Sequence, residues 1–100
     1  MDSGTKEIIF KPKAIKSITA ISKYIAEKGY PENSKKFAAK LYDFGYSLAV
    51  FPNKYPICRF QNFAKRNLHC AVFEGNYIFT YKVVNDKLII YNVIHSKRLK

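Results

Sequence analysis

The sequence predicts an α+β fold, and three observations carry this prediction. A short β-branched and aromatic run, Ile8–Phe10, is typical of a strand. Two longer stretches follow in which apolar residues recur at helical spacing. Beyond residue 67 the pattern changes to alternating or continuous apolar segments separated by short turns, as in an antiparallel meander. We therefore expect a helical hairpin packed on one face of a small, mostly antiparallel sheet.

The first helix is expected to begin at Pro12, because proline is tolerated in the first turn of a helix. Gly29 is expected to end it as the C′ residue. Its buried face has apolar residues at steps of four, three and four, namely Ala14, Ile18, Ile21 and Ile25. Ile15 is also assigned to the core.

Pro31 opens the second helix, where Glu32 interacts favourably with the positive end of the helix dipole. Its apolar stripe consists of Phe37, Leu41, Phe44 and Leu48. Gly45 lowers the helix propensity inside this segment, and Pro52 is expected to stop it. Two amphipathic helices joined by residues 29–31 predict an antiparallel hairpin.

Residues 53–67 are polar, basic and aromatic without clear periodicity, which predicts a loop with a short strand near residues 57–60. Three strands are then expected at 68–73, 77–84 and 87–94, separated by tight turns at 74–76 and 85–86. A chain of 100 residues has the usual size of one domain, so residues 1–100 are expected to form a single domain.

The chain carries 18 Lys and Arg residues against 7 Asp and Glu residues, a formal net charge of +11. This excess indicates an acidic partner, such as a nucleic acid or an acidic protein. An apolar fraction of 48% excludes the composition of a disordered tail. There is no apolar run long enough to span a membrane and no signal-peptide pattern at the N-terminus, so we expect a cytoplasmic protein without membrane contact.

The two cysteines, Cys58 and Cys70, do not form a CxxC pair, and His69 and His95 are the only further soft ligands. We therefore expect no metal site and no cofactor. In a reducing cytosol the cysteines are interpreted as small buried apolar residues.

Several residue strings occur in a characteristic order: residues 10–14 leading into the first helix, residues 24–25 before 29–31, and Phe51-Pro52 closing the second helix. The longest are the C-terminal strings at residues 76–83, 88–90 and 93–98. With these strings, nearly the whole chain resembles the RelE/ParE superfamily, the toxins of bacterial type II toxin–antitoxin systems.

The resemblance implies a growth-inhibiting toxin that is silenced by a small antitoxin in a hetero-oligomer, and the charge of this chain predicts an acidic one. It also implies one of two activities on the same fold, so the fold does not decide the function. RelE-like members cut mRNA in the ribosomal A site. ParE-like members poison DNA gyrase and are not nucleases.

The nuclease activity needs a base, an acid and cations that stabilise the developing phosphorane charge. By resemblance, the candidate catalytic residues are His95, Tyr81 and Arg98. His95 is the best of them, because its ordinary pKa near ~6.5 suits proton transfer. The alternative for His95 is a strand-end histidine that hydrogen-bonds locally or binds the antitoxin. An Arg commonly follows the turn into the middle strand of the meander in RelE-like toxins, whereas this sequence has Ile78 there.

The ending at residues 93–98 resembles the ParE branch, in which a hydrophobic strand is followed by His, a two-residue spacer and Arg. A gyrase poison needs a binding surface and no acid–base pair, so Ile78 does not count against it. We therefore expect a ParE-like gyrase poison. A ribosome-dependent nuclease is the first alternative and a non-toxic nucleic-acid-binding module the second, which leaves open whether the protein is an enzyme.

Basic residues in the loop and tail lie among Tyr55, Phe60 and Phe63. The candidates for binding the target or a nucleic acid are Arg59, Lys65, Arg66, Lys97 and Arg98. Arginine is favoured for bidentate recognition of phosphate or carboxylate. The helix lysines Lys13, Lys16, Lys35 and Lys36 are interpreted as solvated charge.

Overall fold

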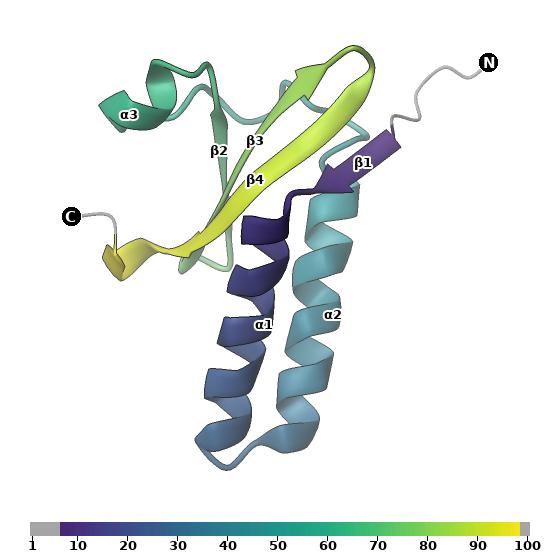
Figure 1. Ribbon diagram of the computed structural model, residues 1–100, viewed down its shortest axis with the longest axis vertical. Coiled ribbons are helices and arrows are strands. Elements are labelled where there is room, and N and C mark those ends of the chain that lie inside the picture. The colour runs from purple at the N-terminus through teal and green to yellow at the C-terminus, as the bar shows by residue number, and fades with distance from the viewer. Residues whose placement is uncertain (1–6, 99–100) are drawn as a thin grey trace.

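A four-stranded mixed sheet and a helical hairpin make up most of the protein, whose computed structural model describes residues 7–98 (Figure 1). In chain order the elements are β1 (Glu7–Phe10), α1 (Pro12–Glu27), α2 (Pro31–Ser47), α3 (Gln61–Ala64), β2 (His69–Phe73), β3 (Tyr77–Val84), β4 (Lys87–His95) and the 3-10 turn η1 (Ser96–Arg98). The strand order is β1-β4-β3-β2, with β1 parallel to β4 and the other pairs antiparallel. The predicted α+β fold is confirmed.

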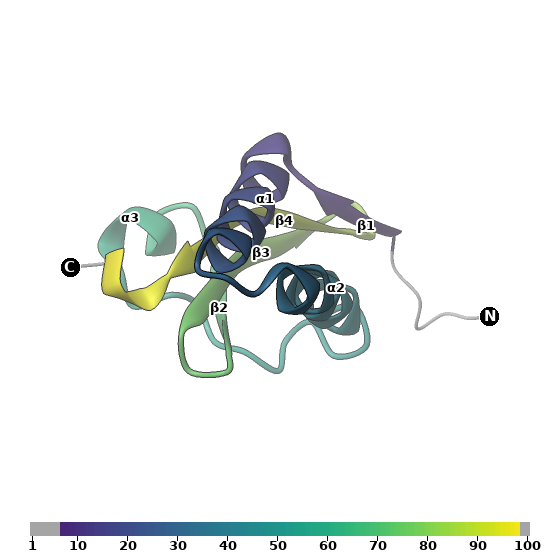
Figure 2. The same ribbon diagram turned by 90° about the horizontal axis from the view of Figure 1, so that it is seen from below.

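Helices α1 and α2 lie side by side as an antiparallel pair (Figures 1 and 2). Ala14 and Ile18 of α1 are fully buried, as the helical spacing predicts. The assignment of Ile15 to the core was wrong, because this residue lies one position off the buried stripe and is 43% exposed. Gly29 has a φ of +98°, so it provides the left-handed residue that ends α1.

Helix α2 ends at Ser47, earlier than the expected stop at Pro52, and residues 48–50 form a turn. Gly45 has a packing reason to lie inside this helix. A Cβ atom at this position would lie 2.6 Å from Cζ of Phe10 and 2.9 Å from Cδ1 of Ile90. The absence of a side chain therefore lets α2 approach β1 and β4 closely.

The core lies between the helical hairpin and the inner face of the sheet. The Phe44 ring of α2 packs 5.0 Å from the ring of Phe79 and 4.9 Å from that of Phe73.

The β3–β4 turn has left-handed φ angles at Asn85 (+51°) and Asp86 (+65°), as expected for a two-residue hairpin turn. No helix among residues 7–98 is both long enough and apolar enough to cross a membrane.

The loop expected at residues 53–67 contains the one-turn helix α3, which is too short to produce a periodic signal. The short strand expected near residues 57–60 is reduced to one bridge between Ile57 and His69. Successive β3 side chains point to opposite faces of the sheet. Phe79 faces α2, so Thr80 faces away from it, and Thr80 shares a pocket with Phe63 of α3. The segment with α3 therefore covers part of the outer face.

Candidate functional site

Tyr81, a candidate catalytic residue, is buried in the core on β3. Its side chain is 0% exposed, and its hydroxyl donates a hydrogen bond of 2.6 Å to the carbonyl oxygen of Pro52. Burial is the main cause that raises the pKa of Tyr81 to about 12. The Tyr81 hydroxyl is therefore committed to the backbone and is not exposed to a substrate.

His95, the other candidate acid or base, is the last residue of β4 and is half-buried. Its ring packs edge-on against Tyr77, with 5.1 Å between the ring centroids. The backbone N–H of Lys97 donates to His95 Nδ1 over 3.2 Å. These contacts match the alternative interpretation of His95, a strand-end histidine with a local hydrogen bond.

His95 and Tyr81 do not share a site. His95 pairs with Tyr77 across the β3–β4 ladder, and Tyr77 precedes Tyr81 by four positions on β3. Four residues of a strand span roughly 13 Å, so one reacting phosphate cannot contact both side chains. The backbone of Arg98 belongs to η1, whereas its side chain lies outside the part of the protein that the structure describes.

Four of the predicted basic residues are exposed but spread over the surface, namely Arg59, Lys65, Arg66 and Lys97. Lys97 follows β4, and Arg59 lies in the loop before α3. Lys65 and Arg66 follow α3 in a turn that ends at Asn67, whose φ is +59°. Arg66 alone joins a cluster, because its guanidinium group stands over the ring of Tyr91 on β4.

The structure adds two lysines to this cluster that sequence reasoning had interpreted differently. Lys11 and Lys13 flank the first residue of α1 and line the same pocket as Arg66 and Tyr91. Lys13 was interpreted as a solvated helix lysine, and Lys11 only as part of the string leading into that helix. Lys11 and Lys13 flank Pro12 in the sequence, but only the tertiary fold brings them close to Arg66.

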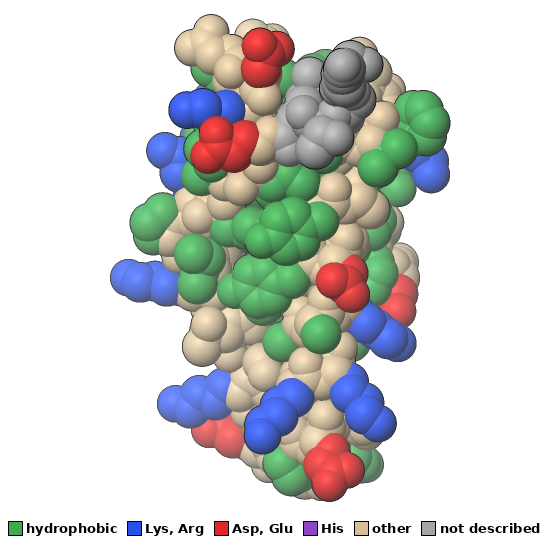
Figure 3. All heavy atoms as spheres, turned by 90° about the vertical axis from the view of Figure 1, so that its right-hand side faces the viewer, with side chains coloured by type: hydrophobic (Ala, Val, Ile, Leu, Met, Phe, Trp, Pro, Cys, Tyr) green, Lys and Arg blue, Asp and Glu red, His purple; other side chains and the backbone are tan. Residues whose placement is uncertain are grey.

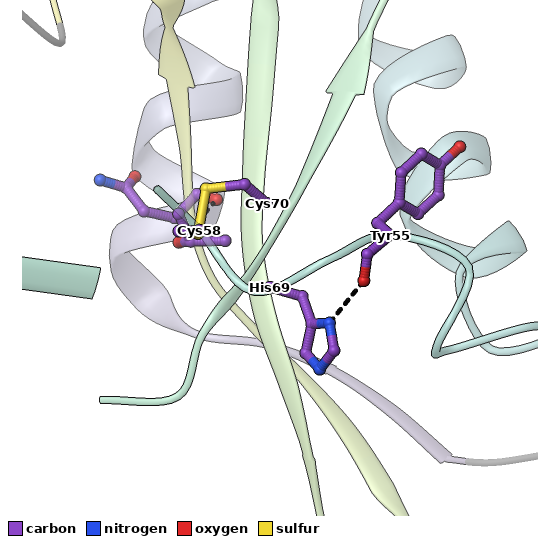
Figure 4. Close-up of a disulfide and its surroundings, with 6 residues drawn as sticks. Tyr55, Cys58, His69 and Cys70 are labelled. Carbon is purple, nitrogen blue, oxygen red and sulfur yellow. Dashed lines mark hydrogen bonds between the residues drawn. A yellow bond between two sulfur atoms is a disulfide. The ribbon is translucent and has the colours of Figure 1, made fainter. Parts of the chain in front are cut away.

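Cys58 and Cys70 form a disulfide bond, so their interpretation as separate apolar residues was wrong, although Cys58 is buried as expected (Figure 4). They come together because the Ile57–His69 bridge lays the loop antiparallel to the start of β2. His69, which sequence analysis weighed only as a metal ligand, fixes the same loop. Its Nδ1–H donates to the carbonyl oxygen of Tyr55 over 2.6 Å, and its ring stacks on Tyr81.

Two further features bear on binding. Within residues 7–98 there is no group of three or more His, Cys, Asp or Glu side chains that is suited to a metal ion. Hydrophobic side chains gather in the middle of the face formed by α2 and β1, with both basic (Lys, Arg) and acidic (Asp, Glu) side chains around its margins (Figure 3). The aromatic rings of Phe10, Tyr42 and Tyr46 belong to one cluster, and Tyr46 is 55% exposed.

The fold is shared with solved toxin–antitoxin structures. A chain of the chromosomal ParDE system from P. aeruginosa superposes with a TM-score of 0.77 at 14% identity, over 93% of this chain and 98% of that chain. A chain of the RelBE2 toxin–antitoxin complex from Mycobacterium tuberculosis gives a TM-score of 0.66 at 15% identity, over 91% of each chain. At such low identity, these likenesses establish the fold alone.

Sequence comparison assigns the family. No curated protein matches the sequence significantly. The family model described as the ParE toxin of the type II toxin–antitoxin system parDE matches residues 8–100. Because this match spans nearly the whole chain, the protein belongs to the ParE toxin family of type II toxin–antitoxin systems, within the RelE/ParE superfamily.

Proposed function

We propose that this protein inhibits growth by binding DNA gyrase and poisoning it, as ParE-like toxins do, and that it does not cut RNA. The observation that carries this proposal is the separation of His95 from Tyr81 together with the burial of the Tyr81 hydroxyl. RNA cleavage needs an acid and a base on the same phosphate. A toxin that acts by binding a protein needs no acid and base.

The residue at position 78 supports the same choice. Ile78 occupies the place where RelE-like toxins commonly carry an Arg, and it is only 7% exposed. A buried aliphatic side chain cannot stabilise the negative charge that develops on a phosphorane. Together with the match to the ParE family model, this substitution favours the gyrase poison over the ribosome-dependent nuclease.

The proposed regulatory partner is an acidic antitoxin that forms a hetero-oligomer with this chain in the cytoplasm. Two features support such a partner, namely the net charge of +11 and the exposed aromatic cluster around Tyr46. An antitoxin helix with one apolar face would cover this cluster, and acidic residues elsewhere in the antitoxin would offset the net charge of this chain.

Induced expression tests the proposal. We expect growth arrest with double-strand DNA breaks and an SOS response, while primer extension shows intact mRNA. The variant His95→Ala should arrest growth equally, because His95 has no acid–base role in this proposal. The purified chain should also inhibit DNA supercoiling by gyrase in vitro.

Two outcomes would overturn this function. Cuts within translated codons that disappear in His95→Ala would establish the nuclease. Normal growth despite soluble, folded protein would instead favour the non-toxic nucleic-acid-binding module. Circular dichroism of each purified variant supplies the control for folding.

A further inference from the structure

A pocket of about 320 Å³ opens where the start of α1, the segment after α3 and the edge of β4 meet. Residues from three separate parts of the chain line it, among them Lys11, Lys13, Arg66, Thr80, Tyr91 and Asn92. The β-bulge opposite Thr80 and Tyr81 inserts Tyr91 into β4 at this point. The bulge therefore places an aromatic ring within a group of cations.

The cations of this pocket converge on Tyr91. Arg66 Cζ lies 5.2 Å from the centroid of the Tyr91 ring, and Lys11 Nζ lies 5.9 Å from it. Lys82 joins them from β3, because its Nζ donates a hydrogen bond of 3.2 Å to the carbonyl oxygen of Arg66. Among the described residues, no carboxylate forms a salt bridge with these cations. Within residues 7–98, the pocket thus holds concentrated positive charge without an internal counterion.

Two further features favour a bound anion in this pocket, namely a free amide donor and the start of a helix. Asn92 Oδ1 accepts bonds from Ser17 Oγ (2.7 Å) and from the backbone N–H of Val93 (2.8 Å), which fixes the orientation of the amide. Its Nδ2 group makes no hydrogen bond to the described residues. In addition, α1 begins without a side-chain cap and without an acidic residue in its first turn. Lys11 and Lys13 therefore lie at the positive end of a helix dipole, an unfavourable placement that a bound anion would relieve.

We propose that this pocket binds a phosphate group of a nucleic-acid backbone. One planar guanidinium group can make the hydrogen bonds that a planar carboxylate accepts. A tetrahedral phosphate, in contrast, accepts hydrogen bonds from donors that approach from several directions. Here the donors come from α1, from the turn after α3 and from β4. The Tyr91 ring offers an apolar surface for the adjoining sugar or base. A gyrase poison does not require this site, so its failure would leave the proposed function untouched.

Fluorescence anisotropy with a labelled single-stranded oligonucleotide tests the proposal on the full chain. In the double variant Lys11→Ala/Arg66→Ala we expect affinity to fall by about tenfold, and the slope of log K against log salt to shrink by about one to two. The matched control, Lys23→Ala/Lys35→Ala, removes the same charge from exposed positions on the helical hairpin. It should retain nearly the full affinity and slope.

The remaining experiments identify the ligand. Backbone amide resonances of residues 11, 13, 14, 66 and 92 should shift when inorganic phosphate is titrated, and the oligonucleotide should compete with it. Equal weakening in both double variants would overturn the proposal, because it would mean that net charge alone binds the oligonucleotide. Phosphate binding without oligonucleotide binding, or tighter binding of polyglutamate than of the oligonucleotide, would also overturn it. If the double variant unfolds, the single variant Lys13→Ala carries the test, because Lys13 is exposed.

Discussion

The hydroxyl group of Tyr81 lies in the interior of the protein, where it donates a hydrogen bond of 2.6 Å to the carbonyl oxygen of Pro52. This hydrogen bond joins β3 to the turn that follows α2, 29 residues earlier in the chain. His69 stacks on the same ring and holds the carbonyl oxygen of Tyr55. A residue that resembles part of a catalytic set thus positions the loop after α2.

Replacing the Tyr81 hydroxyl has a predictable cost in stability. We expect Tyr81→Phe to lower the free energy of unfolding at neutral pH by about 1–2 kcal/mol, because the half-buried Pro52 carbonyl loses its donor. Urea unfolding measures this change. The variant Tyr24→Phe is the control, since the Tyr24 side chain is 60% exposed.

The variants Tyr81→Phe and Tyr24→Phe should also differ in how their stability falls at alkaline pH. The pKa of Tyr81 is raised from 10.0 in a free side chain to about 12 in the folded protein. Stability from this group is therefore complete below pH 10 and is lost as the pH rises towards 12, because only the unfolded chain releases the proton there. Tyr81→Phe should lack this part of the alkaline loss, whereas Tyr24→Phe should keep it. Identical profiles for both variants would contradict the buried phenol.

At the scale of elements, the segment between α2 and β2 is fixed by side chains and has little regular structure of its own. The Cys58–Cys70 disulfide ties it to β2, and the His69–Tyr55 hydrogen bond ties it again a few residues earlier. Because Arg66 follows within this segment, its place over Tyr91 depends on the same anchoring. In a reducing cytosol the two sulfur atoms would be thiols, and the segment would lose one of its two anchors.

Loss of the disulfide should destabilise the protein measurably. A bond across 12 positions of sequence closes a short loop, for which chain entropy predicts a contribution of about 3 kcal/mol. Urea unfolding with and without dithiothreitol measures it, and the variant Cys58→Ala/Cys70→Ala should show no response to the reductant. Two free thiols in the unfolded, unreduced wild-type chain would contradict the bond.

At the scale of the whole molecule, one core connects nearly all the elements. Ala14 and Ile18 of α1, Leu41 of α2, and Phe79 and Ile90 of the sheet are all buried in the same hydrophobic cluster. An excess of positive charge surrounds this core, and part of it gathers at the start of α1. The cohesion of the fold therefore comes from apolar packing and not from the charge.

This arrangement predicts that residues 1–100 unfold as a single domain. Because α1, α2 and the sheet share one core, none of them has a separate core to hold it when the others unfold. Far-ultraviolet circular dichroism, which reports the helices, and tyrosine fluorescence, which includes Tyr81, should give coincident urea transitions under non-reducing conditions. Separate midpoints for the two signals would show that the hairpin and the sheet unfold independently.

The order and type of the main elements follow from the sequence alone, because helical spacing, strand alternation and turn residues are local signals. Ala14 and Ile18, Gly29, and the Asn85–Asp86 turn all behave as these signals predict. Local signals also placed Ile15 in the core, one position from the buried stripe, and extended α2 to Pro52. Contacts between distant segments required the three-dimensional fold: the Cys58–Cys70 bond, the burial of Tyr81, its separation from His95, and the convergence of Lys11, Arg66 and Tyr91. These contacts depend on how strands pair and which face each side chain occupies, and no short stretch of sequence encodes that.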